Sequence, residues 1–364
     1  MSELLDAMKK EGVFPFPTLA VRQHGPVMRT VFFATLCAFS SCLAHEGDDH
    51  ATGVGHVITT ATETGVEGHR YVTIPGWGAM PDGKNIGALH GDLVVDDVGN
   101  VYASTVGGPG IIKFDQFGRF VRTLRSGLNG MHSLTKVKEG GQEFIWGSQY
   151  GKKRAVKFDL EGNIHATLPN QKTGELEGGM NGLTELLVGP DGDIYFFMGY
   201  GSKKIHRLKP DGTLVKTVGG AGTGDSQFKA CHGAAIDHRF DPPRLLVCDR
   251  DGRRMMHLSM DLEWIGLYGP QPLRRPADVD VQGDLAVVGE IEGRISLMDK
   301  KGKIVGTLLD NANKKQWATN GVSANELHDH AASAPHGIKF GPQGQIYLTE
   351  FSKVGRVIAL YPKK

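Results

Sequence analysis

Short segments in which apolar and polar residues alternate recur along the chain from about residue 91 to its C-terminal end. Each unit begins with one such segment, turns at a glycine-containing loop and continues through a second and a third segment. Period-2 alternation between tight turns is typical of antiparallel strands joined by hairpins. The pattern therefore predicts an all-β fold built from repeated sheets. Its clearest first segments are 132–137, 184–188, 232–237 and 336–340.

Two further copies fit the same frame, which gives six units in all. The first residue of the innermost strand, here called the register position, recurs at intervals of 41 to 59 residues. Blades of four strands with loops of variable length would produce this spacing. The sequence thus predicts a six-bladed β-propeller. Its register positions are Gly91, His132, Thr184, His232, Ala277 and His336.

The two ends of the repeat array complement each other. The last unit stops at Tyr361, before a fourth strand, while residues 69–75 precede the first unit and alternate like a strand. We expect this N-terminal strand to complete the sixth blade and to close the ring, because closure removes the unpaired edges of an open array. The alternative is an open β-solenoid.

The N-terminal region is typical of a targeting segment. Met28 and Arg29 precede an apolar run at 31–39 and small residues that end at Ala44. A basic start, a short apolar stretch and a small-residue end describe a secretory signal that is too short to span a bilayer. We expect Met28 to be the true start and the protein to be secreted or periplasmic. A lipoprotein anchored through Cys42, or a disordered tail, is the alternative.

The expected organisation is therefore a signal or targeting segment at 1–44, a flexible linker at 45–68 and the propeller at 69–364. The net charge of +1 provides no field that would recruit nucleic acid or a membrane surface. We expect a monomer without an integral membrane span that takes a small-molecule or peptide substrate. An oxidising compartment permits a disulfide between Cys231 and Cys248, and two buried free thiols are equally compatible with the sequence.

Histidine occupies three of the six register positions, on alternate blades: His132, His232 and His336. Fifteen histidines in 364 residues would place far fewer than one there by chance. Three neutral imidazoles suit a zinc ion and leave a fourth position open for water or substrate. His90 falls one residue out of register, which predicts that its side chain points to the other face of the strand. A one-residue shift of the blade alignment would bring it into the channel, so it is a reserve ligand. The competing interpretation is a set of polar residues that line a channel.

At these residues the chain resembles a known family. The repeats are similar to those of NHL-type propellers, and more closely to the peptidyl-α-hydroxyglycine α-amidating lyase (peptidylamidoglycolate lyase) family, over about residues 70–362. The segments that carry this resemblance are 228–233 with 246–250, 334–336 with 344–347, and 199–205. The resemblance implies zinc bound by His132, His232 and His336, and a catalytic role for Tyr200.

The resemblance also implies a reaction. The family cleaves the C–N bond of a carbinolamide, a peptidyl-α-hydroxyglycine, to an amide and glyoxylate. Tyr200 would take the proton of the substrate hydroxyl, and Arg250 and Lys203 are candidates to hold a substrate carboxylate. The chain departs from the family at Ala334, where the family has Met, and at Gly337, where the family has an Asp that binds a structural calcium. A structural Ca²⁺ is therefore doubtful.

Two other function classes remain open on the sequence alone. A non-catalytic propeller could present its loops to a protein or glycan partner. A lactonase-type hydrolase would share the fold, but lactonase propellers favour oxygen ligands, which three histidines do not supply. The segment His328-Asp329-His330, in the long loop before the sixth blade, could cover the channel or add a ligand, and a plain surface loop is the alternative.

Overall fold

The computed structural model describes residues 56–83, 86–106, 109–124 and 127–363. The predicted signal segment, Cys42 and the first part of the predicted linker lie outside these residues. Within the described part of the chain, no helix is both long enough and apolar enough to cross a bilayer.

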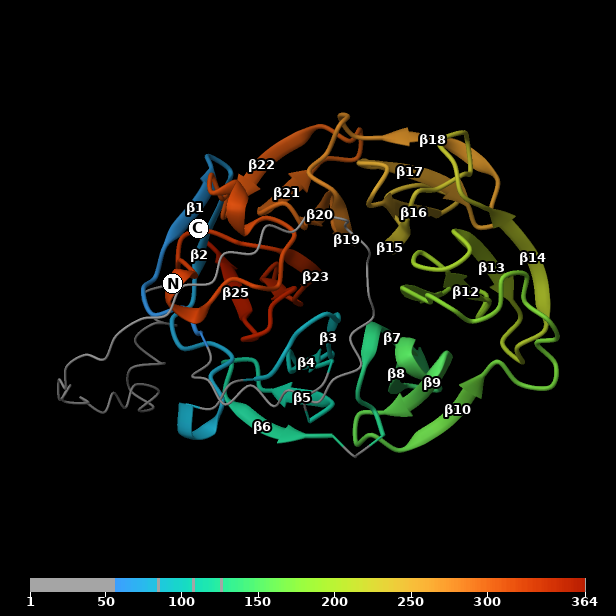
Figure 1. Ribbon diagram of the computed structural model, residues 1–364, viewed down its shortest axis with the longest axis horizontal. Coiled ribbons are helices and arrows are strands. Elements are labelled where there is room, and N and C mark those ends of the chain that lie inside the picture. The colour runs from blue at the N-terminus through green and yellow to red at the C-terminus, as the bar shows by residue number, and fades with distance from the viewer. Residues whose placement is uncertain (1–55, 84–85, 107–108, 125–126, 364) are drawn as a thin grey trace, which may run out of the picture. The chain divides into compact units, whose positions relative to one another are not determined.

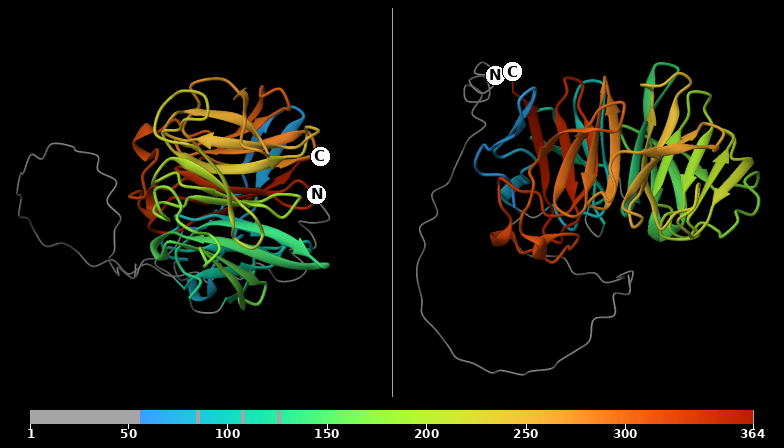
Figure 2. Two further views of the ribbon diagram at one scale, coloured as in Figure 1. Left: turned by 90° about the vertical axis from the view of Figure 1, so that its right-hand side faces the viewer. Right: turned by 90° about the horizontal axis from the view of Figure 1, so that it is seen from above.

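Six antiparallel sheets are arranged in a ring, which confirms the predicted six-bladed β-propeller (Figure 1). Figure 2 shows the strands from the side, running between the two faces of the ring. The strands of blades 1 to 3 are β3 (Leu93–Val95), β4 (Val101–Ser104), β5 (Ile111–Phe114), β6 (Phe120–Thr123), β7 (Met131–Glu139), β8 (Gln142–Gln149), β9 (Arg154–Asp159), β10 (Ile164–Leu168), β11 (Glu185–Val188), β12 (Ile194–Phe197), β13 (Lys204–Leu208) and β14 (Leu214–Gly219).

The strands of blades 4 to 6 are β15 (Cys231–Asp237), β16 (Arg244–Asp249), β17 (Arg254–Ser259), β18 (Trp264–Tyr268), β19 (Pro276–Gln282), β20 (Leu285–Glu290), β21 (Arg294–Met298), β22 (Ile304–Leu308), β23 (Pro335–Phe340), β24 (Ile346–Glu350), β25 (Val357–Pro362), β2 (His69–Thr73) and β1 (Glu63–Val66). Short 3₁₀ turns lie in the connections: η1 (Pro81–Gly83), η2 (Tyr150–Lys152), η3 (Lys314–Gln316) and η4 (Ala324–Glu326).

The N-terminal strand closes the ring as the sequence predicts. Strand β2 pairs with β25, so that Thr73 lies opposite Leu360, and this makes β2 the fourth strand of blade 6. The innermost strands of neighbouring blades contact one another all the way round, including β23 with β3. An open solenoid is thereby excluded. Strand β1 pairs outside β2 as a fifth strand, so regular pairing extends to Glu63, inside the segment that the sequence assigns to a linker.

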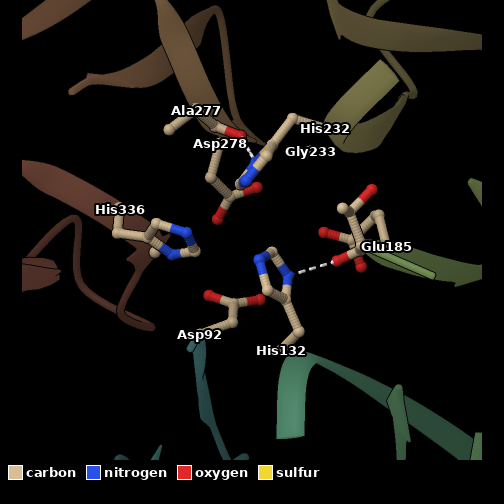
Figure 3. Close-up of a pocket in the computed structure, with 10 residues that line it drawn as sticks. Asp92, His132, Glu185, His232, Gly233, Ala277, Asp278 and His336 are labelled. Atoms are coloured by element: carbon tan, nitrogen blue, oxygen red, sulfur yellow. Dashed lines mark hydrogen bonds between the residues drawn. The ribbon is translucent and has the colours of Figure 1, made fainter. Parts of the chain in front are cut away.

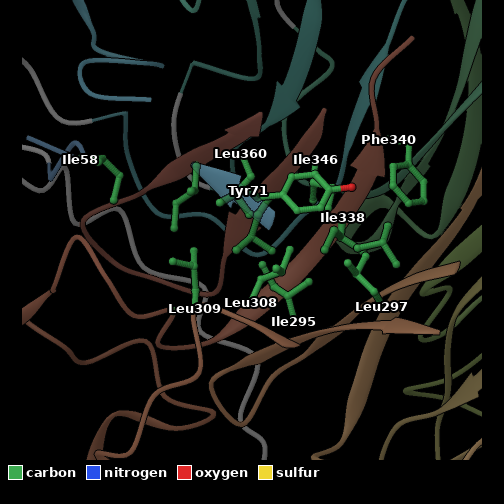
Figure 4. Packing of buried hydrophobic residues seen from close by; sticks show 14 residues of the cluster. Ile58, Tyr71, Ile295, Leu297, Leu308, Leu309, Ile338, Phe340, Ile346 and Leu360 are labelled. Carbon is green, nitrogen blue, oxygen red and sulfur yellow. The ribbon is translucent and has the colours of Figure 1, made fainter. Parts of the chain in front are cut away.

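Apolar side chains fill the spaces between adjacent blades. The cluster between blades 5 and 6 includes Ile58 and Tyr71 from the N-terminal segment, packed against residues of both sheets such as Leu308 and Ile338 (Figure 4). Cys231 and Cys248 are free thiols. They lie on paired strands, and their side chains enter different clusters on the two faces of blade 4, so they do not form a disulfide.

A β-bulge interrupts the innermost strand of blades 2, 4, 5 and 6 at the register position. In β7 the pairing shifts between Met131 and Ser133, and in β23 it shifts between Pro335 and Gly337. Equivalent shifts occur in β15 and β19. A bulge sets two residues against one on the partner strand and re-aims a side chain. In each of these four blades the bulge therefore turns one residue of the innermost strand toward the axis.

Because β1 and β2 close the ring, a chain that begins at residue 76 should lose much of its stability. It would expose the edge of β25 and delete the buried side chains of Ile58, Tyr71 and Ile74, at a cost of at least about 5 kcal/mol. Thermal unfolding followed by circular dichroism checks this, with a chain that begins at residue 56 as the control. Equal melting temperatures for the two chains would contradict the closure role.

Candidate functional site

Histidines from three alternate blades converge on the axis of the ring. His132 lies on β7, His232 on β15 and His336 on β23, each at a bulge. The centroids of their imidazole rings are 4.9 Å apart in all three pairs, and the side chains are almost fully buried. Figure 3 shows the three rings around a common centre. The structure thus brings together the three residues that the register selects.

Backbone carbonyls of the following blades orient two of these imidazoles. The Nδ1–H of His132 donates to the carbonyl oxygen of Thr184 at 2.7 Å, and that of His232 donates to Ala277 at 2.8 Å. A carbonyl oxygen only accepts, so Nδ1 carries the proton and Nε2 presents a lone pair to the axis. This is the arrangement that holds metal-binding imidazoles in place. For His336 the corresponding backbone neighbour is Gly91, whose hydrogen-bonding group acts to raise the pKa of the imidazole.

The site keeps its histidines neutral. Burial is the largest cause, and it lowers the pKa of His132, His232 and His336 well below the ordinary value of 6.5. Burial and then the nearby charge of Arg250 lower the pKa of His90 to about 4. Neutral imidazoles are the form that binds a metal ion.

The hydroxyl of Tyr200 lies where the imidazoles meet. It is 2.8 Å from His232 Nε2, 3.1 Å from His90 Nε2 and 3.3 Å from His132 Nε2. Arg250 Nη1 also donates to the hydroxyl oxygen at 2.9 Å. One phenolic proton cannot satisfy several inward-facing lone pairs, so the centre has an excess of electron pairs over protons. This donor set fits a borderline-soft divalent cation such as zinc.

A tight turn between β12 and β13 fixes the position of Tyr200. The backbone N–H of Tyr200 donates to Gly182 at 3.1 Å. A Cβ atom at Gly201 would lie 1.8 Å from the carbonyl oxygen of Asn181, so no side chain fits there. Lys203, a candidate for substrate binding, instead donates from Nζ to the carbonyl oxygen of Gly199 at 2.7 Å and stabilises this same turn.

Arg250 follows β16 and reaches Tyr200 from the next blade. Its guanidinium lies 5.0 Å from the centroid of the Tyr200 ring and donates to both carboxylate oxygens of Asp251, at 3.1 and 3.3 Å. Asp251 also accepts from Arg275 at 2.6 Å. Burial lowers the pKa of Arg250, but Tyr200 and Asp251 raise it more, so the net value lies above the ordinary one. A fixed positive charge therefore faces the Tyr200 oxygen.

His90 belongs to the same cluster, contrary to the prediction that its side chain points to the other face. Its ring centroid is 5.0 Å from that of His132 and 4.8 Å from that of His336. Strand β3 begins only at Leu93, and Leu89 makes a single bridge to Ser352, so strand alternation does not extend to His90. Ligand atoms of His90, His132 and His336 all lie within 4.8 Å of one another.

Below the imidazoles lies a ring of carboxylates that sequence reasoning missed. Asp92, Glu185 and Asp278 come from blades 1, 3 and 5 and are each 3% exposed. A cavity of about 10 Å³ between the two layers has room for roughly one water molecule. Each acid directly follows a register position that is not histidine. In the repeat alignment, the position directly after the register position would have identified all three acids.

The mouth of the site carries two aromatic residues that the sequence did not single out. The ring centroid of Tyr150 is 5.8 Å from that of Tyr200 and 6.4 Å from that of His132. The ring centroid of Phe351 is 4.7 Å from that of His90. Tyr150 and Phe351 each directly follow the second strand of their blade, as Arg250 does in blade 4. Aligning the second strands would have identified this position.

The segment His328-Asp329-His330 lies elsewhere. It lines a separate pocket together with residues 56–62. Asp329 accepts backbone hydrogen bonds from Thr59 at 3.0 Å and Thr60 at 2.7 Å, and the rings of His328 and His330 stack on each other. This loop secures the N-terminal segment and supplies no ligand to the axial cluster.

The structure does not fit the calcium site of the family that the sequence resembles. A Cβ atom at Gly337 would lie 2.7 Å from both the Cα and the Oδ1 of Asp92. The aspartate that the family has there could not be accommodated next to Asp92.

No family model matches the chain, and no curated protein matches it. Among solved structures it is similar to a gluconolactonase from Xanthomonas campestris (13% identity, 86% of this chain and 99% of that one, TM-score 0.58). It is also similar to a putative gluconolactonase (14% identity, 79% and 94% coverage, TM-score 0.53). A streptogramin B lyase aligns with 18% identity, 86% and 95% coverage and a TM-score of 0.48.

At these identities the two gluconolactonase structures show the shared six-bladed fold alone. Neither is a peptidyl-α-hydroxyglycine lyase, so that resemblance rests on this chain's own residues.

Replacing Tyr200 by Phe should lower the free energy of unfolding by about 1–3 kcal/mol, because the buried Arg250 guanidinium loses a hydrogen-bond acceptor. Urea unfolding measures the change. Tyr150→Phe is the matched control and should change stability by less than about 0.5 kcal/mol. Equal stabilities of the two variants would argue against a structural link between the Tyr200 hydroxyl and Arg250.

Proposed function

We propose that the protein is an exported zinc-dependent lyase that cleaves the C–N bond of a carbinolamide such as a peptidyl-α-hydroxyglycine. The convergence of imidazoles from alternate blades around the Tyr200 hydroxyl carries this proposal. The secretory signal expected from the sequence supports the exported location.

In this proposal His132, His232 and His336 hold the zinc ion. The Nδ1 hydrogen bonds of His132 and His232 fix both rings with Nε2 facing inward. The neutral state of all three imidazoles removes proton competition for the ligand atoms near neutral pH. The ligand atoms of His90 also lie within 4.8 Å of those of His132 and His336, so His90 is the alternative to His232 as the third ligand.

When bound, zinc would supply a Lewis acid that makes the substrate hydroxyl more acidic. In its ionised form, which the guanidinium of Arg250 stabilises, Tyr200 takes the hydroxyl proton and becomes a neutral phenol. As the carbinol oxygen forms a carbonyl bond, the C–N bond breaks and its electron pair passes to the amide nitrogen. Return of the proton to that nitrogen gives a primary amide, and the remaining fragment is glyoxylate.

The aromatic side chains at the mouth suit this substrate class. Tyr150 and Phe351 are partly exposed beside the imidazoles and present apolar surface to a peptide that approaches along the axis. Arg250 supplies a fixed positive charge next to Tyr200 and is also the candidate to receive the substrate carboxylate. Asp251 uses two of the five guanidinium donors and Tyr200 uses one, which leaves two N–H donors for a carboxylate.

A lactonase-type hydrolase fits these residues less well. Oxygen ligands and calcium would be expected for that class, whereas nitrogen ligands face the mouth in this chain. A propeller that only binds a partner would have no reason to gather three buried histidines and the half-buried His90 around a tyrosine hydroxyl.

Purified protein should contain about one zinc ion per chain. His132→Ala, His232→Ala and His336→Ala should each lose it, whereas His90→Ala and the exposed control His238→Ala should retain it. Metal analysis by mass spectrometry after dialysis measures the content. Zinc lost in His90→Ala but kept in His232→Ala would show that the wrong third ligand has been assigned.

The wild type should release glyoxylate from a model hydroxyglycine peptide, and a chelator should abolish this activity until zinc is restored. Tyr200→Phe should keep its zinc and lose about 100-fold or more in kcat, because the proton acceptor is gone. Glyoxylate release by His232→Ala at the wild-type rate would disprove the proposal.

A further inference from the structure

The carboxylate ring beneath the imidazoles has a defined geometry. Asp92, Glu185 and Asp278 project into the channel from alternate blades, and Figure 3 shows them around the same axis as the histidines. Each accepts a backbone hydrogen bond: Asp92 Oδ1 from Leu93 at 2.7 Å, Glu185 Oε1 from Leu186 at 2.8 Å, and Asp278 Oδ2 from Ile338 at 3.0 Å. Asp278 Oδ1 is buried without a partner among the described residues.

The ammonium of Lys339 faces this ring. Lys339 lies on β23, three residues after His336, and its Nζ is 2.6 Å from Asp278 Oδ2 and 3.0 Å from Asp92 Oδ2. The side chain of Lys339 is 16% exposed, and those of the two aspartates are 4% and 5% exposed. The ammonium therefore bridges blades 1 and 5 from blade 6.

Electrostatics favour a cation at this position. Three carboxylates in a water-poor channel repel one another and lose hydration energy, and both effects favour protonation. Burial is the largest cause of the raised pKa of Asp92, about 8, and the Asp278 charge adds to it. Burial lowers the pKa of Lys339, but the surrounding carboxylates raise it more, so the amine stays charged.

We infer that the Lys339 ammonium is the built-in counter-ion of the channel: it stands where a divalent cation bridging Asp92 and Asp278 would otherwise bind. Lys339 then neutralises the channel carboxylates of the wild type, so the protein folds without a metal ion bound to them. This agrees with the steric exclusion of an aspartate at Gly337. It also keeps a second metal ion out of the layer below the imidazoles.

The test uses metal-free full-length protein, prepared with a chelator and then dialysed into chelator-free buffer. Millimolar Ca²⁺ should leave the wild-type Tm unchanged within about 1 °C, because imidazoles bind Ca²⁺ poorly and Lys339 blocks the carboxylates. Lys339→Met should lower the Tm by about 10 °C, because buried carboxylates lose their counter-ion. Ca²⁺ should then restore several degrees by binding the vacated position.

The double variant Lys339→Met/Asp278→Asn is the matched control. Removing a negative charge together with the ammonium should raise its Tm above that of Lys339→Met, and Ca²⁺ should shift it little. If Lys339→Met does not fold, the effect of Ca²⁺ on the Tm of the wild type and of the double variant still tests the inference. A wild-type Tm that rises with Ca²⁺, or a Lys339→Met protein that is as stable as wild type or insensitive to Ca²⁺, would overturn the inference. These outcomes do not depend on zinc or on lyase activity.

Discussion

The limited space on the axis of the closed ring determines which side chains can occupy each level of the channel. Six innermost strands must approach one another, so bulky side chains can occupy a given level only on every second blade. At the level of the imidazoles, histidines on blades 2, 4 and 6 alternate with Gly91, Thr184 and Ala277. At the next level the order inverts, and the acids on blades 1, 3 and 5 alternate with Ser133, Gly233 and Gly337. A Cβ atom at Gly233 would lie 2.7 Å from the Cα of Asp278, so the two levels interlock.

Because the two levels interlock, the nitrogen ligand atoms of the histidines and the oxygen ligand atoms of the acids come from adjacent levels of the channel, one residue apart along the strands. Nitrogen donors face the mouth, where they are neutral and their backbone partners are carbonyls of neighbouring blades. Oxygen donors lie beneath them with an ammonium from blade 6. In a low-dielectric channel an uncompensated charge is costly, so the lower level requires its own cation, whereas the imidazoles of the upper level stay neutral beside the Arg250 guanidinium.

Much of the fold and part of the site could be predicted from the sequence because both depend on strand alternation. The blade count, the ring closure by residues 69–75 and the convergence of His132, His232 and His336 all follow from the repeat. The position of His90 could not be predicted, because it precedes the regular strand and its direction is set by a loop. Lys339 could not be placed either, because a charged residue at that register is usually solvent-exposed.

The residues proposed to perform the chemistry lie in turns, whereas the proposed zinc ligands lie on the innermost strands. Tyr200 and Arg250 lie in turns between the second and third strands, and the geometry of these turns, which at Tyr200 requires Gly201, directs their side chains to the axis. Turns can change without disturbing the blades, since the blades are held together by the apolar layers between them. Propellers of the same architecture can thus carry unrelated activities. The ring itself is compatible with a lyase, a lactonase or a binding protein. What distinguishes this chain is the contact between the Tyr200 oxygen, the Arg250 guanidinium and the imidazoles.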